Sequence, residues 1–123
     1  MTAFHDLSEL EPRVIWPGLI ARPLHGAEAT LAQIELEPDV DVPEHEHVNE
    51  QIGILTGGTL TFRIGGEEKL LRPGDGWVIK AHVPHSVTAG PDGATLIELF
   101  APPRDDWAGR ERLPARPPQG FGF

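Results

Sequence analysis

Apolar and polar side chains alternate over short stretches of this chain, and the clearest example is residues 59–64. Leucine, phenylalanine and isoleucine occupy every second position there, which is the period of a β-strand with one buried face. Gly65-Gly66 follows directly, and two glycines suit the positive φ angles of a tight hairpin turn. We therefore expect residues 67–71 to form the returning strand.

The same pattern recurs along the chain between prolines and glycines, of which there are 13 and 14. Pro73-Gly74-Asp75-Gly76 has the composition of a second turn. Helical periodicity is scarce, and short strands between closely spaced turns are typical of an all-β sandwich or barrel. The remaining strands are expected at residues 13–16, 29–36, 49–55, 77–80, 85–88 and 95–100.

The chain is expected to form one domain over residues 1–123, with a barrel core at about 13–101. Residues 102–123 contain five prolines and four arginines, so little regular structure is expected there. A short helical turn near residues 104–107, capped by an aspartate, is the exception, and Trp107 favours docking of that part. For residues 110–123, docking and terminal disorder both remain open.

Charge and composition exclude several classes of function. The net charge is −9, which argues against nucleic-acid binding and against anionic membranes as partners. The chain has no cysteine, so disulfides, a thiol nucleophile and a cysteine metal site are all excluded. Acidic residues near the start do not resemble a signal peptide, and no apolar run is long enough to cross a membrane. We expect a soluble, cytoplasmic protein.

The candidate chemistry lies in His45-Glu46-His47-Val48-Asn49-Glu50-Gln51 and in Pro84-His85. Side chains alternate between the faces of an extended strand, so His45 and His47 point the same way. The same parity, carried through a bend, brings Gln51 to that side and turns Glu50 away. His45, His47, Gln51 and His85 are therefore candidate metal ligands.

Three imidazoles and one amide oxygen suit a divalent transition metal ion such as Mn, Fe, Co, Ni or Zn. Four protein ligands leave positions open on an octahedral ion, so a substrate can bind the metal directly. A neutral amide also leaves the charge of the ion uncompensated by the protein. This favours a small carboxylated substrate.

The spacing His45-x-His47-x3-Gln51, with Gly58, Pro73-Gly74-Asp75 and Val83-Pro84-His85 after it, resembles the two motifs of the cupin superfamily. The resemblance implies a jelly-roll barrel, the double-stranded β-helix, with these three histidines and the glutamine on a metal. It also implies a homodimer, and unpaired strand edges would favour one.

A closer resemblance covers about residues 43–107. Glu50-Gln51-Ile52-Gly53, Ile64-Gly65-Gly66-Glu67 and Phe100-Ala101-Pro102-Pro103-Arg104-Asp105 are similar to the small cupins of pectin and alginate breakdown. Those enzymes linearise 4,5-unsaturated uronates to 5-keto-4-deoxyuronates. The likeness implies that Glu98, Phe100 and Arg104 complete the catalytic site. The chain departs from the pattern by Glu98, where aspartate is expected, and by His82, where glycine is usual.

Glu98 also stands out from the residues alone. The stretch 95–100 is apolar on both faces, so it is expected to be buried, and a buried carboxylate is costly unless it is paired or functional. Catalysis is one explanation, and an ion pair with Arg104 or Arg63 is the other. Arg104 itself could clamp a substrate carboxylate or be an ordinary surface charge.

The favoured function is ring opening and tautomerisation of an unsaturated uronate, with Glu98 moving the proton and Phe100 shaping the pocket. Two alternatives use the same site. The first is an iron-dependent dioxygenase, and the second is a protein that binds a small acid without catalysis.

Overall fold

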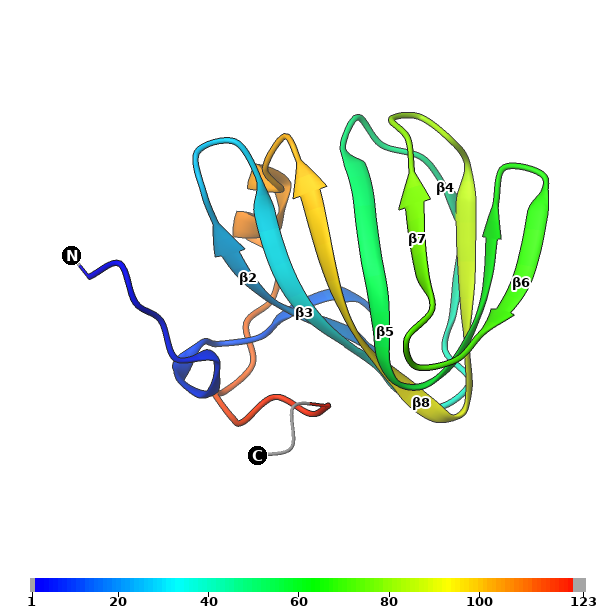
Figure 1. Ribbon diagram of the computed structural model, residues 1–123. Coiled ribbons are helices and arrows are strands. Elements are labelled where there is room, and N and C mark those ends of the chain that lie inside the picture. Colours follow the sequence, from blue (N-terminus) through cyan, green and yellow to red (C-terminus); the bar gives the residue numbers. More distant parts are fainter. Residues whose placement is uncertain (1, 121–123) are drawn as a thin grey trace.

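The computed structural model describes residues 2–120, and Figure 1 shows their arrangement. They form an all-β structure with eight strands and two short 3-10 helices. The bounds are η1 Leu7–Glu9, β1 Arg13–Trp16, β2 Leu19–His25, β3 Thr30–Leu36, β4 Asp41–His45, β5 Glu50–Ile64, β6 Glu67–Leu71, β7 Gly76–Ile79, β8 His85–Ala101 and η2 Asp105–Gly109.

Two long strands, β5 and β8, run antiparallel and belong to both walls of the barrel. The first half of β5 pairs with β7 and with the second half of β8, which in turn pairs with β3. With β2 and β1 these form the larger sheet. The second half of β5, the first half of β8, β4 and β6 form the smaller sheet. This confirms the predicted all-β jelly roll.

The prediction of separate strands at 49–55 and 59–64, and at 85–88 and 95–100, is wrong, because each pair is one continuous strand. Glycines bend these strands where they cross. The register of β5 against β8 shifts around Gly57 and Gly58, and a Cβ atom at Gly58 would lie 2.0 Å from the carbonyl oxygen of Gly93. The glycines that resemble a turn in the sequence therefore form a β-bulge, at which the backbones of β5 and β8 approach each other closely.

The sequence pattern did not predict two of the strands. Strand β2 contains Pro23, and β4 is short and polar with Pro43 inside it, so neither has the expected alternation. Both are strands because neighbouring chain segments pair with them: β2 lies between β1 and β3, and β4 borders β8. Tertiary pairing outweighs local preference at such positions.

The C-terminal segment wraps the barrel as far as residue 120. Val14 donates its backbone N–H to the carbonyl of Glu111 at 2.8 Å, and Leu113 donates to that of Pro12 at 2.8 Å. Trp107 is 2% exposed, which confirms its docking. The expected aspartate cap is wrong, because Arg104 occupies the cap position of η2 and makes no side-chain capping bond. Residues 121–123 of the predicted tail lie outside the described residues.

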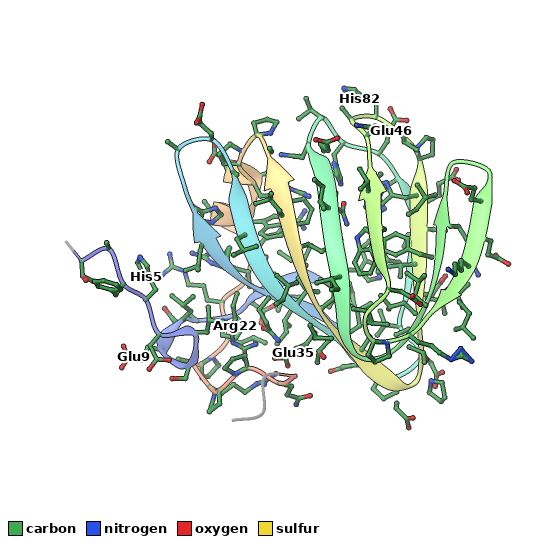
Figure 2. All side chains as sticks on the ribbon, in the orientation of Figure 1. His5, Glu9, Arg22, Glu35, Glu46 and His82 are labelled. Atoms are coloured by element: carbon green, nitrogen blue, oxygen red, sulfur yellow. The ribbon has the colours of Figure 1, made fainter. Side chains whose placement is uncertain are left out.

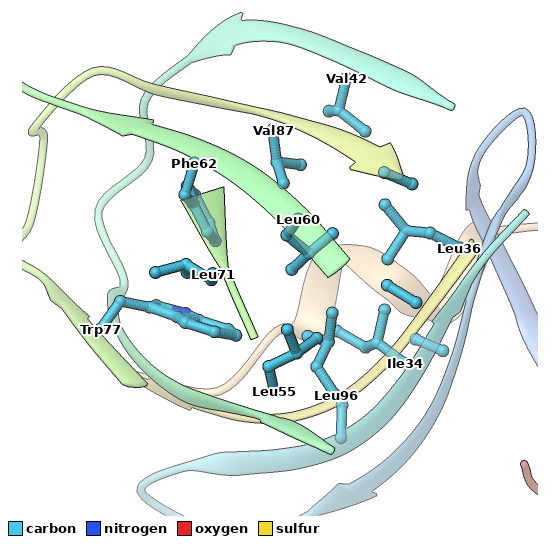
Figure 3. Close-up of a cluster of buried hydrophobic side chains, with 14 of the residues drawn as sticks. Ile34, Leu36, Val42, Leu55, Leu60, Phe62, Leu71, Trp77, Val87 and Leu96 are labelled. Atoms are coloured by element: carbon cyan, nitrogen blue, oxygen red, sulfur yellow. The ribbon is translucent and has the colours of Figure 1, made fainter. Parts of the chain in front are cut away.

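The core fills the space between the two walls, and Figure 3 shows its central side chains. On the outside, an apolar row crosses four strands of the larger sheet in register. Its members are at least 37% exposed and are Leu31, Leu99, Ile52 and Val78. The homodimer stays a prediction. Within residues 2–120, no helix has both the length and the apolar character that crossing a bilayer requires.

A buried ionic cluster attaches the C-terminal segment to β2 and β3. Arg22 is fully buried and lies 2.5 Å from Glu35, whose other oxygen is 2.9 Å from Arg116. The backbone N–H of Gln119 donates to Glu35 at 3.0 Å, and Gln33 donates to it at 3.1 Å. Figure 2 shows Arg22 and Glu35 on the side of the barrel where the C-terminal segment lies.

Replacing Glu35 by glutamine should lower the free energy of unfolding by about 3 kcal/mol, because Arg22 would stay buried without its carboxylate. Urea denaturation at pH 7 measures this difference. The matched control is Glu68→Gln, which breaks the exposed pair with Arg63 and should cost less than about 1 kcal/mol. An equal loss in both variants would contradict the cluster's role.

The same stabilisation should depend on pH. Burial alone raises the pKa of Glu35, but hydrogen bonds from Gln119, Arg116, Gln33 and Arg22 outweigh it, and the pKa lies below its ordinary value of 4.5. A carboxyl group with a lowered pKa stabilises fully above its unfolded pKa and loses that effect as pH falls through the folded one. The difference in the free energy of unfolding between wild type and Glu35→Gln should therefore become smaller in acid.

Candidate metal centre

Three histidines from separate segments converge at one end of the barrel, where His45 is exposed, His47 is half-buried and His85 is buried. His45 ends β4, His47 lies in the loop before β5, and His85 begins β8 directly opposite His45 in the register. One nitrogen from each ring lies within 4.8 Å of the others. The strand pairing therefore brings together ligands that are forty residues apart in the sequence.

The backbone fixes the orientation of all three rings. Each Nδ1 lies 2.9 Å from a backbone carbonyl oxygen, to which it donates a proton. The accepting carbonyls belong to Pro43, Asn49 and Val83. A neutral imidazole that donates through Nδ1 keeps a lone pair on Nε2, and this arrangement commonly orients metal-binding histidines.

Gln51, the first inward residue of β5, completes the set. Its Oε1 lies 3.0 Å from Nε2 of His47, and its Nε2 donates to Glu98. Two lone-pair atoms then face each other at hydrogen-bond distance with no proton between them. Among the described residues, Nε2 of His85 is buried and has no hydrogen-bond partner. A divalent cation would satisfy all of these atoms, so the residues fit a metal ion.

The electrostatics keep the rings of His85 and His47 in their ligating form. Burial lowers the pKa of His85 to about 4, and the nearby His45, His47 and Arg104 act in the same direction. Burial and then Arg104 lower the pKa of His47. Both rings are therefore neutral at pH 7, as metal binding requires.

Glu98 lies beside these ligands, near the middle of the inner face of the larger sheet. It is 5% exposed and accepts hydrogen bonds from Gln51 and, at 2.8 Å, from Nε1 of Trp77. Burial raises the pKa of Glu98 to about 7, although both hydrogen bonds oppose the rise. The alternative of an ion pair with arginine is wrong, because Arg63 pairs with Glu68 and Arg104 pairs with Asp106.

Phe100 and Arg104 lie next to Glu98 in the same cavity. The guanidinium of Arg104 stacks 5.0 Å from the ring centre of Phe100 and 4.8 Å from that of Trp107. Its Nε and Nη2 bind Asp106 at 3.1 and 2.9 Å. These contacts fix the largely buried side chain of Arg104. A substrate would have to bind the edge of the guanidinium that does not face Asp106.

The cavity has a volume of about 270 Å³ and continues from the polar cluster into the apolar interior. Sequence reasoning did not identify Trp16, Trp107 and Arg110, which also line the cavity, as site components. No motif or spacing marks them. Trp107 and Arg110 reach the cavity because the C-terminal segment wraps the barrel, and Trp16 is the last residue of β1. His82 is 62% exposed by side chain and lies 3.9 Å from Glu46, and both residues are on loops at the top of Figure 2.

Residues 32–100 match the family model described as the cupin domain. The chain belongs to the cupin family. A curated relative, the pectin degradation protein KdgF of Dickeya dadantii (strain 3937), is 28% identical over 68 residues. That match covers 55% of this chain and 62% of the relative, so this cupin spans about three-fifths of the relative's length.

Solved structures show the same architecture. KdgF from Halomonas sp. is 26% identical, covers 86% of this cupin and 98% of its own chain, and superimposes with a TM-score of 0.78. An RmlC-like cupin from Shewanella frigidimarina is also 26% identical, with coverages of 86% and 96% and a TM-score of 0.79. The similarity thus extends well beyond the two metal-binding motifs.

Replacing His85 by alanine should weaken metal binding by about 100-fold or more, since the loss of an outer partner of a ligand alone costs roughly 10–100-fold. Metal content after dialysis, measured by atomic emission, tests this. His82→Ala is the control and should retain the wild-type metal content, because His82 lies on the exposed loop. Equal metal content in His85→Ala and wild type would contradict the assignment.

Proposed function

We propose that this cupin is a metal-dependent enzyme that converts a 4,5-unsaturated uronate into a 5-keto-4-deoxyuronate. One observation carries the proposal. A buried carboxyl group with a pKa near 7, Glu98, is hydrogen-bonded to the amide that faces the histidine cluster. An acid-base group thus lies beside a candidate metal centre, as proton transfer on a metal-held substrate requires. Similarity to two KdgF proteins supports the choice of substrate.

Substrate binding would rest on positive charge. The proposed ligands are three imidazoles and an amide, and none of them is an anion, so the protein does not offset the charge of a divalent ion and an anionic substrate is favoured. Arg104 and Arg110 line the same cavity. Nη1 of Arg104 makes no hydrogen bond to any part of the chain that the structure describes, and we propose that it binds the uronate carboxylate.

The reaction is an isomerisation, so no atoms are gained or lost. The bond between C1 and the ring oxygen breaks, C1 becomes an aldehyde, and the enol at C5 becomes a ketone when C4 gains a proton. A bound divalent ion would supply Lewis-acid polarisation of the carboxylate and a neighbouring oxygen. Glu98 would accept the proton from a hydroxyl oxygen and deliver it to C4, which a pKa near neutrality permits in both directions.

Phe100 would form the wall against which the sugar ring lies. It is 3% exposed and contacts the ring of His47 at a centroid distance of 6.1 Å. The guanidinium of Arg104 stacks over its ring. A rigid aromatic wall between the metal ligands and the arginine would restrict the orientation of the substrate.

The direct test is the ultraviolet absorbance of an unsaturated monouronate, whose conjugated double bond disappears on linearisation. The metal-loaded protein should remove this absorbance far faster than the spontaneous reaction, and chelation should stop the acceleration. Metal-loaded protein that leaves the spontaneous rate unchanged would rule out the uronate reaction. Oxygen consumption with diketones or flavonols would then test the dioxygenase alternative.

Glu98→Gln should reduce turnover by about 100-fold or more while the protein keeps its metal, because an amide cannot carry the proton. His45→Ala should lose both metal and turnover. Rates from the absorbance assay and metal content by atomic emission separate the two effects. An inactive Glu98→Gln protein without metal would show that Glu98 maintains the metal site and would leave its catalytic role unsupported.

A further inference from the structure

Trp77 makes a contact that its place in the hydrophobic core does not explain. Its ring packs in the core 5.1 Å from the ring centre of Phe62 and beside Leu71, as Figure 3 shows. Its Nε1 nevertheless donates a hydrogen bond of 2.8 Å to Oε2 of Glu98. That oxygen also accepts from Gln51. The indole and the amide therefore hold the same carboxylate oxygen.

Gly53 makes this contact possible. In the register of the larger sheet, Gly53 on β5 lies between Trp77 on β7 and Glu98 on β8. All three positions face the interior, and the absence of a side chain at Gly53 leaves space through which the other two meet. A Cβ atom at Gly53 would lie 2.4 Å from the indole ring and 2.5 Å from its Nε1. Any residue except glycine would therefore displace the indole.

We propose that Trp77 is a positioning residue of the metal centre, acting through Glu98 and Gln51 across the space at Gly53. The indole N–H holds the carboxylate of Glu98. The carboxylate accepts from Nε2 of Gln51, so the amide must present Oε1 to His47 and to the metal. The inference builds on the proposed metal site and deepens the proposed function.

The alternative is that the hydrogen bond only satisfies a buried indole. A buried N–H without a partner is costly, so an acceptor for Nε1 of Trp77 is favourable in either case. The two accounts differ in what removal of the N–H changes. If the bond is only structural, its loss alters stability alone. If Trp77 positions the ligands, its loss also weakens metal binding, because partners of ligands contribute to affinity.

The experiment is a titration of metal-free protein with Co²⁺, followed by its visible absorption bands, which report both affinity and ligand geometry. Trp77→Phe keeps an aromatic ring in the core and removes the N–H donor together with the five-membered ring that carries it. We expect about tenfold weaker Co²⁺ binding and altered bands. The control is Leu71→Ala, which disturbs the same packing and leaves the N–H in place. It should lose stability but keep wild-type Co²⁺ affinity.

Gly53→Ala provides a second, independent perturbation. It keeps the indole but displaces it from Glu98, so it should shift Co²⁺ affinity and the absorption bands in the same direction as Trp77→Phe. Circular dichroism and thermal unfolding of each variant establish that the compared proteins are folded. Wild-type Co²⁺ affinity and bands in a folded Trp77→Phe protein would overturn the proposal.

The activity measurement separates this inference from the proposed function. If the wild-type protein linearises the uronate, Trp77→Phe should lower kcat about tenfold with little change in KM, because the carboxylate is misplaced while the substrate still binds. If the wild-type protein has no such activity, the proposed function fails. The Co²⁺ titration then still decides the role of Trp77.

Discussion

The pairing of β5 with β8 along almost their whole length is the constraint on which the rest of this structure depends. Each strand is too long to remain in one flat sheet, and glycines let both bend at the point where they cross. The first half of one strand pairs with the second half of the other, so a single antiparallel pair forms the centre of both walls. Every other strand pairs directly or indirectly with this pair.

This arrangement explains why the site lies where it does. Gln51 is the second residue of β5, His85 begins β8, and Glu98 and Phe100 lie near the end of β8, so all four residues come from the central pair. Strands β4 and β7 then add His45 and Trp77 from either side. Gln51, His85, Glu98 and Trp77 are buried, and buried polar groups must satisfy one another. They do so except at the nitrogen and oxygen atoms that face the histidine cluster.

Much of the fold was predictable because local patterns specify it. The hairpin of β5 and β6 around Gly65-Gly66 follows from strict alternation and turn chemistry, and it is confirmed. Strand β4 was not predictable, since a short polar segment with a proline becomes a strand only when β8 offers it partners. Glycines at the crossing were misread as ends of strands, because a bulge and a turn require the same backbone freedom.

The sequence by itself determined the identity and parity of the candidate site. Alternation of side chains in extended backbone grouped His45, His47 and Gln51 without coordinates, although His47 lies in the loop between β4 and β5, and the cupin motif added His85. Only the tertiary structure decided the partners of Glu98 and the role of Trp77. These contacts join residues from three strands whose register depends on the whole sheet, and the position of the missing side chain at Gly53 has meaning only within that register.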